Sequence, residues 1–159
     1  PVFLVVLYLD FAGARWWALG IFIVACLTDF VDGYIARHYN QITNFGKFMD
    51  PLADKMLVMA AMCYFVEYGQ MPGWCLAIVL LREFAVSGMR LVAVEQGRVI
   101  AAAWSGKVKT ASTMVCLCLM LVFQSNLLNV VCIAVIVATT VYSGIEYFAK
   151  NLDVFKEAD

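Results

Sequence analysis

Long apolar blocks separated by short polar breaks dominate this chain. Most blocks approach the roughly 20 residues that a helix needs to cross a bilayer. The pattern predicts five long helices, over 16–37, 46–68, 72–94, 107–123 and 127–150. A sixth apolar stretch ends near Leu9 and is too short to span about 30 Å of hydrocarbon alone. We therefore predict an all-α integral membrane protein with six transmembrane helices, which form one domain over residues 1–159.

The start of the chain reads as the end of a helix. It opens with Pro1 instead of methionine, and it has neither the basic region nor the cleavage site of a signal peptide. We expect the first transmembrane helix to be truncated here, with its beginning before Pro1.

Composition supports the membrane assignment, because 64% of the residues are hydrophobic against about half in soluble domains. The six cysteines lie in apolar stretches without a C-x-x-C pair, so we expect small buried side chains and no metal or redox role. The net charge of −1 is uninformative, and no nucleic-acid partner is expected.

The basic residues predict the orientation. Most flank the connections 38–45 and 95–106 or follow the last helix, whereas Arg15 is the only one near the opposite side. The positive-inside rule therefore places these connections and both termini in the cytoplasm.

Four aspartates are the candidate catalytic centre. Asp29 and Asp32 are three residues apart, and Asp50 and Asp54 are four apart, so each pair shares one face of its predicted helix. Carboxylates at membrane depth are costly unless they are paired or bind a cation. A short connection favours antiparallel neighbours whose acidic faces oppose each other.

Hard divalent cations would relieve the repulsion between these carboxylates, and Mg²⁺ or Mn²⁺ suits such oxygen ligands together with substrate phosphates. Two ions would bridge a pyrophosphate and stabilise a leaving phosphate. Gly33 and Gly46 leave room for a close ligand, and Arg37 is placed to meet a phosphate. The alternative is structural: Asp29 and Asp32 would pair with Arg37, and Asp50 and Asp54 would be first-turn acids.

The run Asp-x2-Asp-Gly-x2-Ala-Arg-x8-Gly-x3-Asp-x3-Asp, from Asp29 to Asp54, resembles the signature of the CDP-alcohol phosphotransferases at every position. Further segments are similar to the bacterial phosphatidylglycerophosphate synthases within that family, namely 82–90, 106–110 and 143–148.

The resemblance implies a six-helix enzyme, usually a homodimer, in the bacterial cytoplasmic membrane with its active site toward the cytoplasm. It implies phosphatidyl transfer from the membrane lipid CDP-diacylglycerol to sn-glycerol 3-phosphate. It also implies metal binding by Asp29, Asp32, Asp50 and Asp54, with Asp54 as the general base. The CDP-donor pocket would comprise Asp29, Asp32, Gly33, Ala36, Arg37 and Gly46.

An acceptor that carries a phosphate requires a second, basic pocket. Arg82 and Arg90 are eight residues apart, roughly on one helical face, and Lys107 begins the next helix. We predict that these three side chains bind the acceptor phosphate. Arg82 could instead neutralise Glu83 or Glu146, and Lys109 is expected merely to follow the positive-inside rule.

Two other functions compete with this assignment. A synthase of the same family with another acceptor, such as a cardiolipin synthase or an inositol-phosphate type, would share the four aspartates. A divalent-cation transporter would also place acids in the membrane. However, the aspartates lie toward one side, and no acidic ladder continues across the other half.

Overall fold

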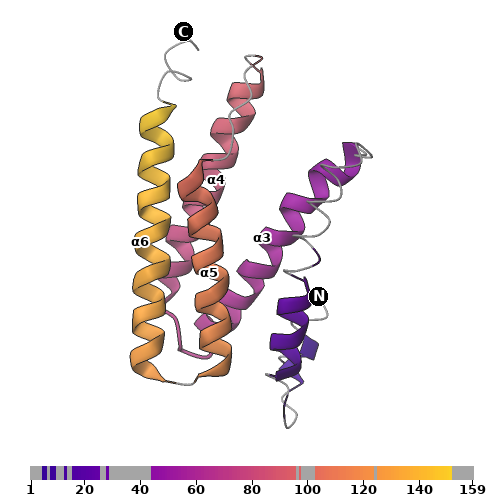
Figure 1. Ribbon diagram of the computed structural model, residues 1–159, viewed down its shortest axis with the longest axis vertical. Coiled ribbons are helices and arrows are strands. Elements are labelled where there is room, and N and C mark those ends of the chain that lie inside the picture. The colour runs from indigo at the N-terminus through magenta and orange to yellow at the C-terminus, as the bar shows by residue number, and fades with distance from the viewer. Residues whose placement is uncertain are drawn as a thin grey trace.

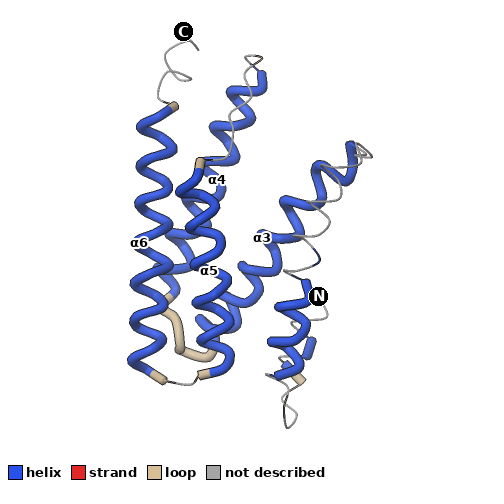
Figure 2. The backbone as a smooth tube through the Cα atoms, in the orientation of Figure 1, coloured by secondary structure: helices blue, strands red, loops and turns tan. Residues whose placement is uncertain are grey.

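The computed structural model describes residues 5–6, 8–9, 13, 16–25, 28, 44–95, 97, 103–123 and 125–151, with side chains from residue 55 onward in the helix that begins at Asn44. Every regular element in these ranges is helical (Figure 2), which confirms the all-α prediction. A short helix over Trp16–Ala25 precedes four long ones: α3 (Asn44–Glu67), α4 (Gly73–Glu95), α5 (Trp104–Val122) and α6 (Asn126–Lys150).

The apolar blocks predicted the long helices closely. The predicted ranges 46–68, 72–94, 107–123 and 127–150 match α3 to α6, with ends that differ by at most three residues. The largest difference is at α5, which begins at Trp104 because Gly106, taken as part of a break, lies inside the first turn. Of the predicted helix 16–37, the part over Trp16–Ala25 is helical.

A tight turn joins α3 to α4. Gly69 has a φ of 68°, in the left-handed region that glycine adopts without strain. The Gln70 amide donates to the Phe65 carbonyl over 2.8 Å, so the turn satisfies a backbone carbonyl at the end of α3. Pro72 follows and prevents the helix from continuing.

The long helices alternate in direction (Figure 1). The start of α3, the end of α4, the start of α5 and the end of α6 lie toward the same end of the molecule. α6 packs against α4 and α5, and α3 contacts α4 and α5. The start of α3 leans away from the other helices, so the first turns of α3 flank the bundle at this end.

The interior of the bundle is apolar, and so is much of its outer surface. Leu117 and Met120 of α5 pack with Ile136 of α6 in the core. On α4, by contrast, Leu81, Phe84 and Leu91 are exposed. Large apolar side chains on the outside of a helix bundle are typical of a surface that contacts lipid or another protein.

Among the described helices, α5 and α6 are long and apolar enough to cross a membrane. The helices α3 and α4 are also long, but they carry more charged residues, including Lys55 on α3 and Arg82 and Glu83 on α4. A membrane protein is thus supported by composition and surface, whereas the number of six spans stays a prediction.

Replacement of core leucines should separate protein packing from lipid contact. Leu117→Ala should lower the unfolding free energy by at least ~2 kcal/mol, because it leaves a cavity beside Met120 and Ile136. Leu119→Ala is the matched control on the same helix, since Leu119 is 36% exposed whereas Leu117 is fully buried. Thermal unfolding in detergent measures both variants, and equal losses of stability would contradict this assignment of the core.

Candidate active site

Of the eight residues predicted to bind the metals and the donor, the structure describes the three that belong to α3. Asp29, Asp32, Gly33, Ala36 and Arg37 lie outside the described residues. Gly46, Asp50 and Asp54 belong to α3, of which the structure describes the backbone at these positions.

The register of α3 relates Asp50 and Asp54 to the core. Asp50, Asp54 and Val58 follow one another at intervals of four residues, and Ala61 comes three residues later. These positions share one helical face. Val58 and Ala61 are buried in the core, so the aspartates occupy the continuation of the face that packs inward. The backbone thus confirms that Asp50 and Asp54 are one turn apart on a single helix.

A buried ion-pair cluster is centred on Glu83 of α4, and we call it the Glu83 cluster. It comprises Glu83, Arg82, Lys55 and Lys109. Glu83 Oε1 accepts hydrogen bonds from Lys109 Nζ over 2.7 Å and from Arg82 Nη1 over 3.0 Å. Lys55 Nζ lies 3.4 Å from Glu83 Oε2 and donates to Ser87 Oγ over 2.8 Å. Three helices therefore contribute cations to one carboxylate.

Lys109 differs from its expected role. Its side chain is only 5% exposed, and it forms the shortest ion pair of the Glu83 cluster. A lysine that merely marked the cytoplasmic side would lie in water. The sequence does contain a sign of this burial, because Lys109 lies on the same helical face as the buried Thr113, Cys116 and Met120.

Arg82 bridges three helices, which confirms the alternative that it pairs with Glu83. Its Nη2 donates to Ser143 Oγ of α6 over 2.6 Å. Two glycines make room for the side chain: a Cβ at Gly106 would lie 3.4 Å from Arg82 Nη2, and a Cβ at Gly144 would lie 3.4 Å from Arg82 Cγ. Glu146, the other proposed partner, pairs with Lys150 instead.

The other two residues predicted for the acceptor pocket contact aromatic rings. Arg90 Nε donates to the Tyr147 hydroxyl over 3.0 Å, and its guanidinium lies 5.6 Å from the ring centre. Lys107 Nζ lies 5.7 Å from the Trp104 ring centre. Neither cation pairs with a carboxylate among the side chains that the structure describes.

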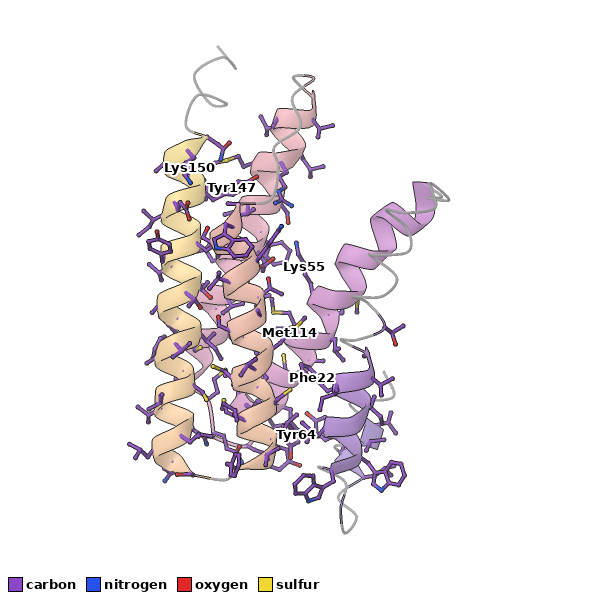
Figure 3. All side chains as sticks on the ribbon, viewed as in Figure 1. Phe22, Lys55, Tyr64, Met114, Tyr147 and Lys150 are labelled. Carbon is purple, nitrogen blue, oxygen red and sulfur yellow. The ribbon has the colours of Figure 1, made fainter. Side chains whose placement is uncertain are left out.

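A cavity of about 160 Å³ lies against the Glu83 cluster, between α3, α4 and α5. Lys55, Glu83, Lys109 and Thr110 form its polar part, and the remaining lining is Val58, Met59, Thr113 and Met114. Figure 3 shows Lys55 on the side of α3 that faces the bundle. Asp54 directly precedes Lys55 and is one turn from Val58, so the cavity begins beside the acidic face of α3. This arrangement suits a small anionic molecule that must approach the aspartates.

No group of three or more histidine, cysteine or acidic residues among the described residues is arranged to hold a metal ion. The four predicted ligands lie outside that search, because their side chains are not described. The metal site thus stays a prediction.

Enlarging Gly106 should displace Arg82. Gly106→Leu places a side chain where the guanidinium lies, and overpacking of this kind destabilises by about 1–3 kcal/mol. Gly88→Leu on α4 is the control, because a Cβ at Gly88 meets no atom within 4 Å. Thermal unfolding compares the two, and an unchanged Gly106→Leu variant would show that Arg82 is not confined.

Comparison with known proteins identifies the family. The family model for CDP-alcohol phosphatidyltransferase matches residues 1–142. The chain is 43% identical over 145 residues to the CDP-diacylglycerol–glycerol-3-phosphate 3-phosphatidyltransferase of Bacillus subtilis, covering 87% of this chain and 75% of the relative. It is 39% identical over 158 residues to a probable phosphatidylglycerophosphate synthase of Mycobacterium tuberculosis H37Rv, covering 96% and 75%. This chain therefore belongs to the CDP-alcohol phosphatidyltransferase family of enzymes.

Proposed function

We propose that this protein transfers the phosphatidyl group of CDP-diacylglycerol to sn-glycerol 3-phosphate, giving phosphatidylglycerophosphate and CMP. The names of its relatives support this substrate pair. The observation that carries the proposal is the cationic cavity beside the aspartate-bearing face of α3. It offers a phosphate-bearing acceptor a site from which its hydroxyl reaches the aspartates.

Asp29, Asp32, Asp50 and Asp54 would hold two Mg²⁺ or Mn²⁺ ions. The donor set fits these metals, since all four groups are hard oxygen ligands and the α3 backbone sets Asp50 and Asp54 one turn apart. When bound, the ions would supply charge neutralisation at the pyrophosphate. The donor pocket would further comprise Gly33, Ala36, Arg37 and Gly46.

Asp54 would act as the general base. It accepts the proton of the acceptor hydroxyl as that oxygen forms a bond to the lipid-side phosphorus of the donor. The bond between this phosphorus and the bridging oxygen breaks, and CMP leaves with the electron pair on its phosphate. Such transfer depends mainly on positioning and electrostatic stabilisation, which the carboxylates and cations of the site supply.

Arg82, Arg90 and Lys107 stay the residues predicted to bind the acceptor phosphate, although none of them lines this cavity. Arg90 and Lys107 suit this role because their described contacts are with Tyr147 and Trp104. We further propose a homodimer in the cytoplasmic membrane of a bacterium, with the acidic end of α3 facing the cytoplasm. The basic residues at that end favour this orientation.

Removal of the proposed base should abolish turnover without unfolding the protein. Asp54→Asn should lower kcat for CMP release at least about 100-fold, because no general base then accepts the proton of the acceptor hydroxyl. Glu67→Gln is a control at the other end of α3, where Glu67 accepts a hydrogen bond from Tyr8. Normal turnover in Asp54→Asn would refute the assignment of the base.

The choice of acceptor should be visible in product formation. CMP release from CDP-diacylglycerol should require Mg²⁺ or Mn²⁺, stop with excess chelator, and be much faster with glycerol 3-phosphate than with glycerol or serine. Chelation removes the proposed counter-ions of the carboxylates. Faster release with phosphatidylglycerol or inositol phosphate would reassign the protein to another synthase of the family, and metal uptake without CMP release would indicate a transporter.

A further inference from the structure

The Glu83 cluster carries more positive charge than its carboxylate compensates. Three cations surround one acid, which leaves these four side chains with a net charge of +2. Excess charge in an apolar bundle is costly unless an anion approaches it. Glu83 is the carboxylate that meets these cations among the side chains that the structure describes, and an anion that enters the cavity would add further negative charge beside them.

The three cations are not equivalent. Lys109 and Arg82 are nearly buried, at 5% and 12% exposure, and both bind Glu83 Oε1 at hydrogen-bond distance. Lys55 is 39% exposed and forms the longest ion pair, at 3.4 Å. Its ammonium group is therefore the most accessible of the three to a ligand, which would replace the 3.4 Å ion pair with Glu83 and the hydrogen bond to Ser87.

Position along α3 gives Lys55 a direct relation to the chemistry. It follows Asp54 immediately, and Val58 on the Asp54 face lines the same cavity. A phosphate held by Lys55 would therefore place the rest of the same acceptor molecule beside the turns of α3 that carry Asp50 and Asp54.

We propose that Lys55 binds the phosphate of the acceptor, and that Glu83 is a positioning residue that holds Lys55 and Lys109 at the polar end of the cavity. The inference rests on the proposed function and adds two residues to it. The ligand class is a small polyol phosphate. The cavity of about 160 Å³ has room for a ligand of this size.

Lys55→Met tests the phosphate contact, because it keeps an unbranched side chain one atom shorter than lysine and removes its charge. The KM for glycerol 3-phosphate should rise about tenfold or more, the effect of losing one hydrogen bond to a charged group. The KM for CDP-diacylglycerol should stay within about twofold, since the donor would bind elsewhere. Lys55→Arg should restore much of the loss, and Lys150→Met, which removes an exposed lysine paired with Glu146, should change neither constant.

The positioning role of Glu83 needs a variant that remains folded. Glu83→Gln leaves Lys109 and Arg82 buried without a counter-charge and is expected to destabilise the protein. The double variant Glu83→Gln with Lys109→Met removes one charge of each sign and should recover thermal stability. If Glu83 positions Lys55, the KM for glycerol 3-phosphate stays high in this stable double variant. A wild-type KM for glycerol 3-phosphate in the double variant would show that Glu83 has only a structural role.

Two results would overturn the assignment of Lys55: an unchanged acceptor KM in Lys55→Met, or a larger rise in the KM for CDP-diacylglycerol. Failure of the proposed function looks different, because wild-type protein would then release no CMP with glycerol 3-phosphate. In that case, thermal unfolding with and without inorganic phosphate tests whether the cavity binds an anion. Stabilisation of the wild type that is lost in Lys55→Met supports the anion site, and no stabilisation of the wild type refutes it.

Discussion

The structure depends on the need to neutralise charge inside an apolar helix bundle. Glu83 lies between helices whose other contacts are largely apolar, and an isolated carboxylate there would be unstable. Lys55, Arg82 and Lys109 meet it from α3, α4 and α5, and Arg82 extends the network to Ser143 on α6. All four long helices are therefore fixed relative to one another by one set of polar contacts. Gly106 and Gly144 lie against the Arg82 side chain.

This constraint also explains how a membrane bundle can hold a polar site. The ion pairs give the cavity between α3, α4 and α5 a basic wall. On the proposed function, the acids of α3 would bind metals and donor while the cations opposite would bind the acceptor. Because Asp54 and Lys55 are consecutive, one helix would set the distance between the base and the acceptor phosphate.

The sequence was sufficient for the helices and for the family, since both depend on local patterns. Apolar blocks located α3 to α6 within three residues, and the spacing from Asp29 to Asp54 pointed to the family that the comparison then identified. The contacts of the basic residues required tertiary structure. Lys55 and Glu83 are 28 positions apart, and Lys109 is 26 from Glu83, so no local pattern indicated that they meet. Lys109 nevertheless has the helical spacing of the buried residues of α5. Its positive charge concealed this sign of burial in the sequence.

The central claim, phosphatidyl transfer to glycerol 3-phosphate, is tested most directly by following the acceptor into lipid. The protein in nanodiscs would receive CDP-diacylglycerol, Mg²⁺ and ¹³C-labelled glycerol 3-phosphate, and mass spectrometry would quantify labelled lipid together with CMP. Transfer of the phosphatidyl group to glycerol 3-phosphate would give labelled phosphatidylglycerophosphate in equal amount to CMP. CMP release without label in the lipid fraction would contradict it.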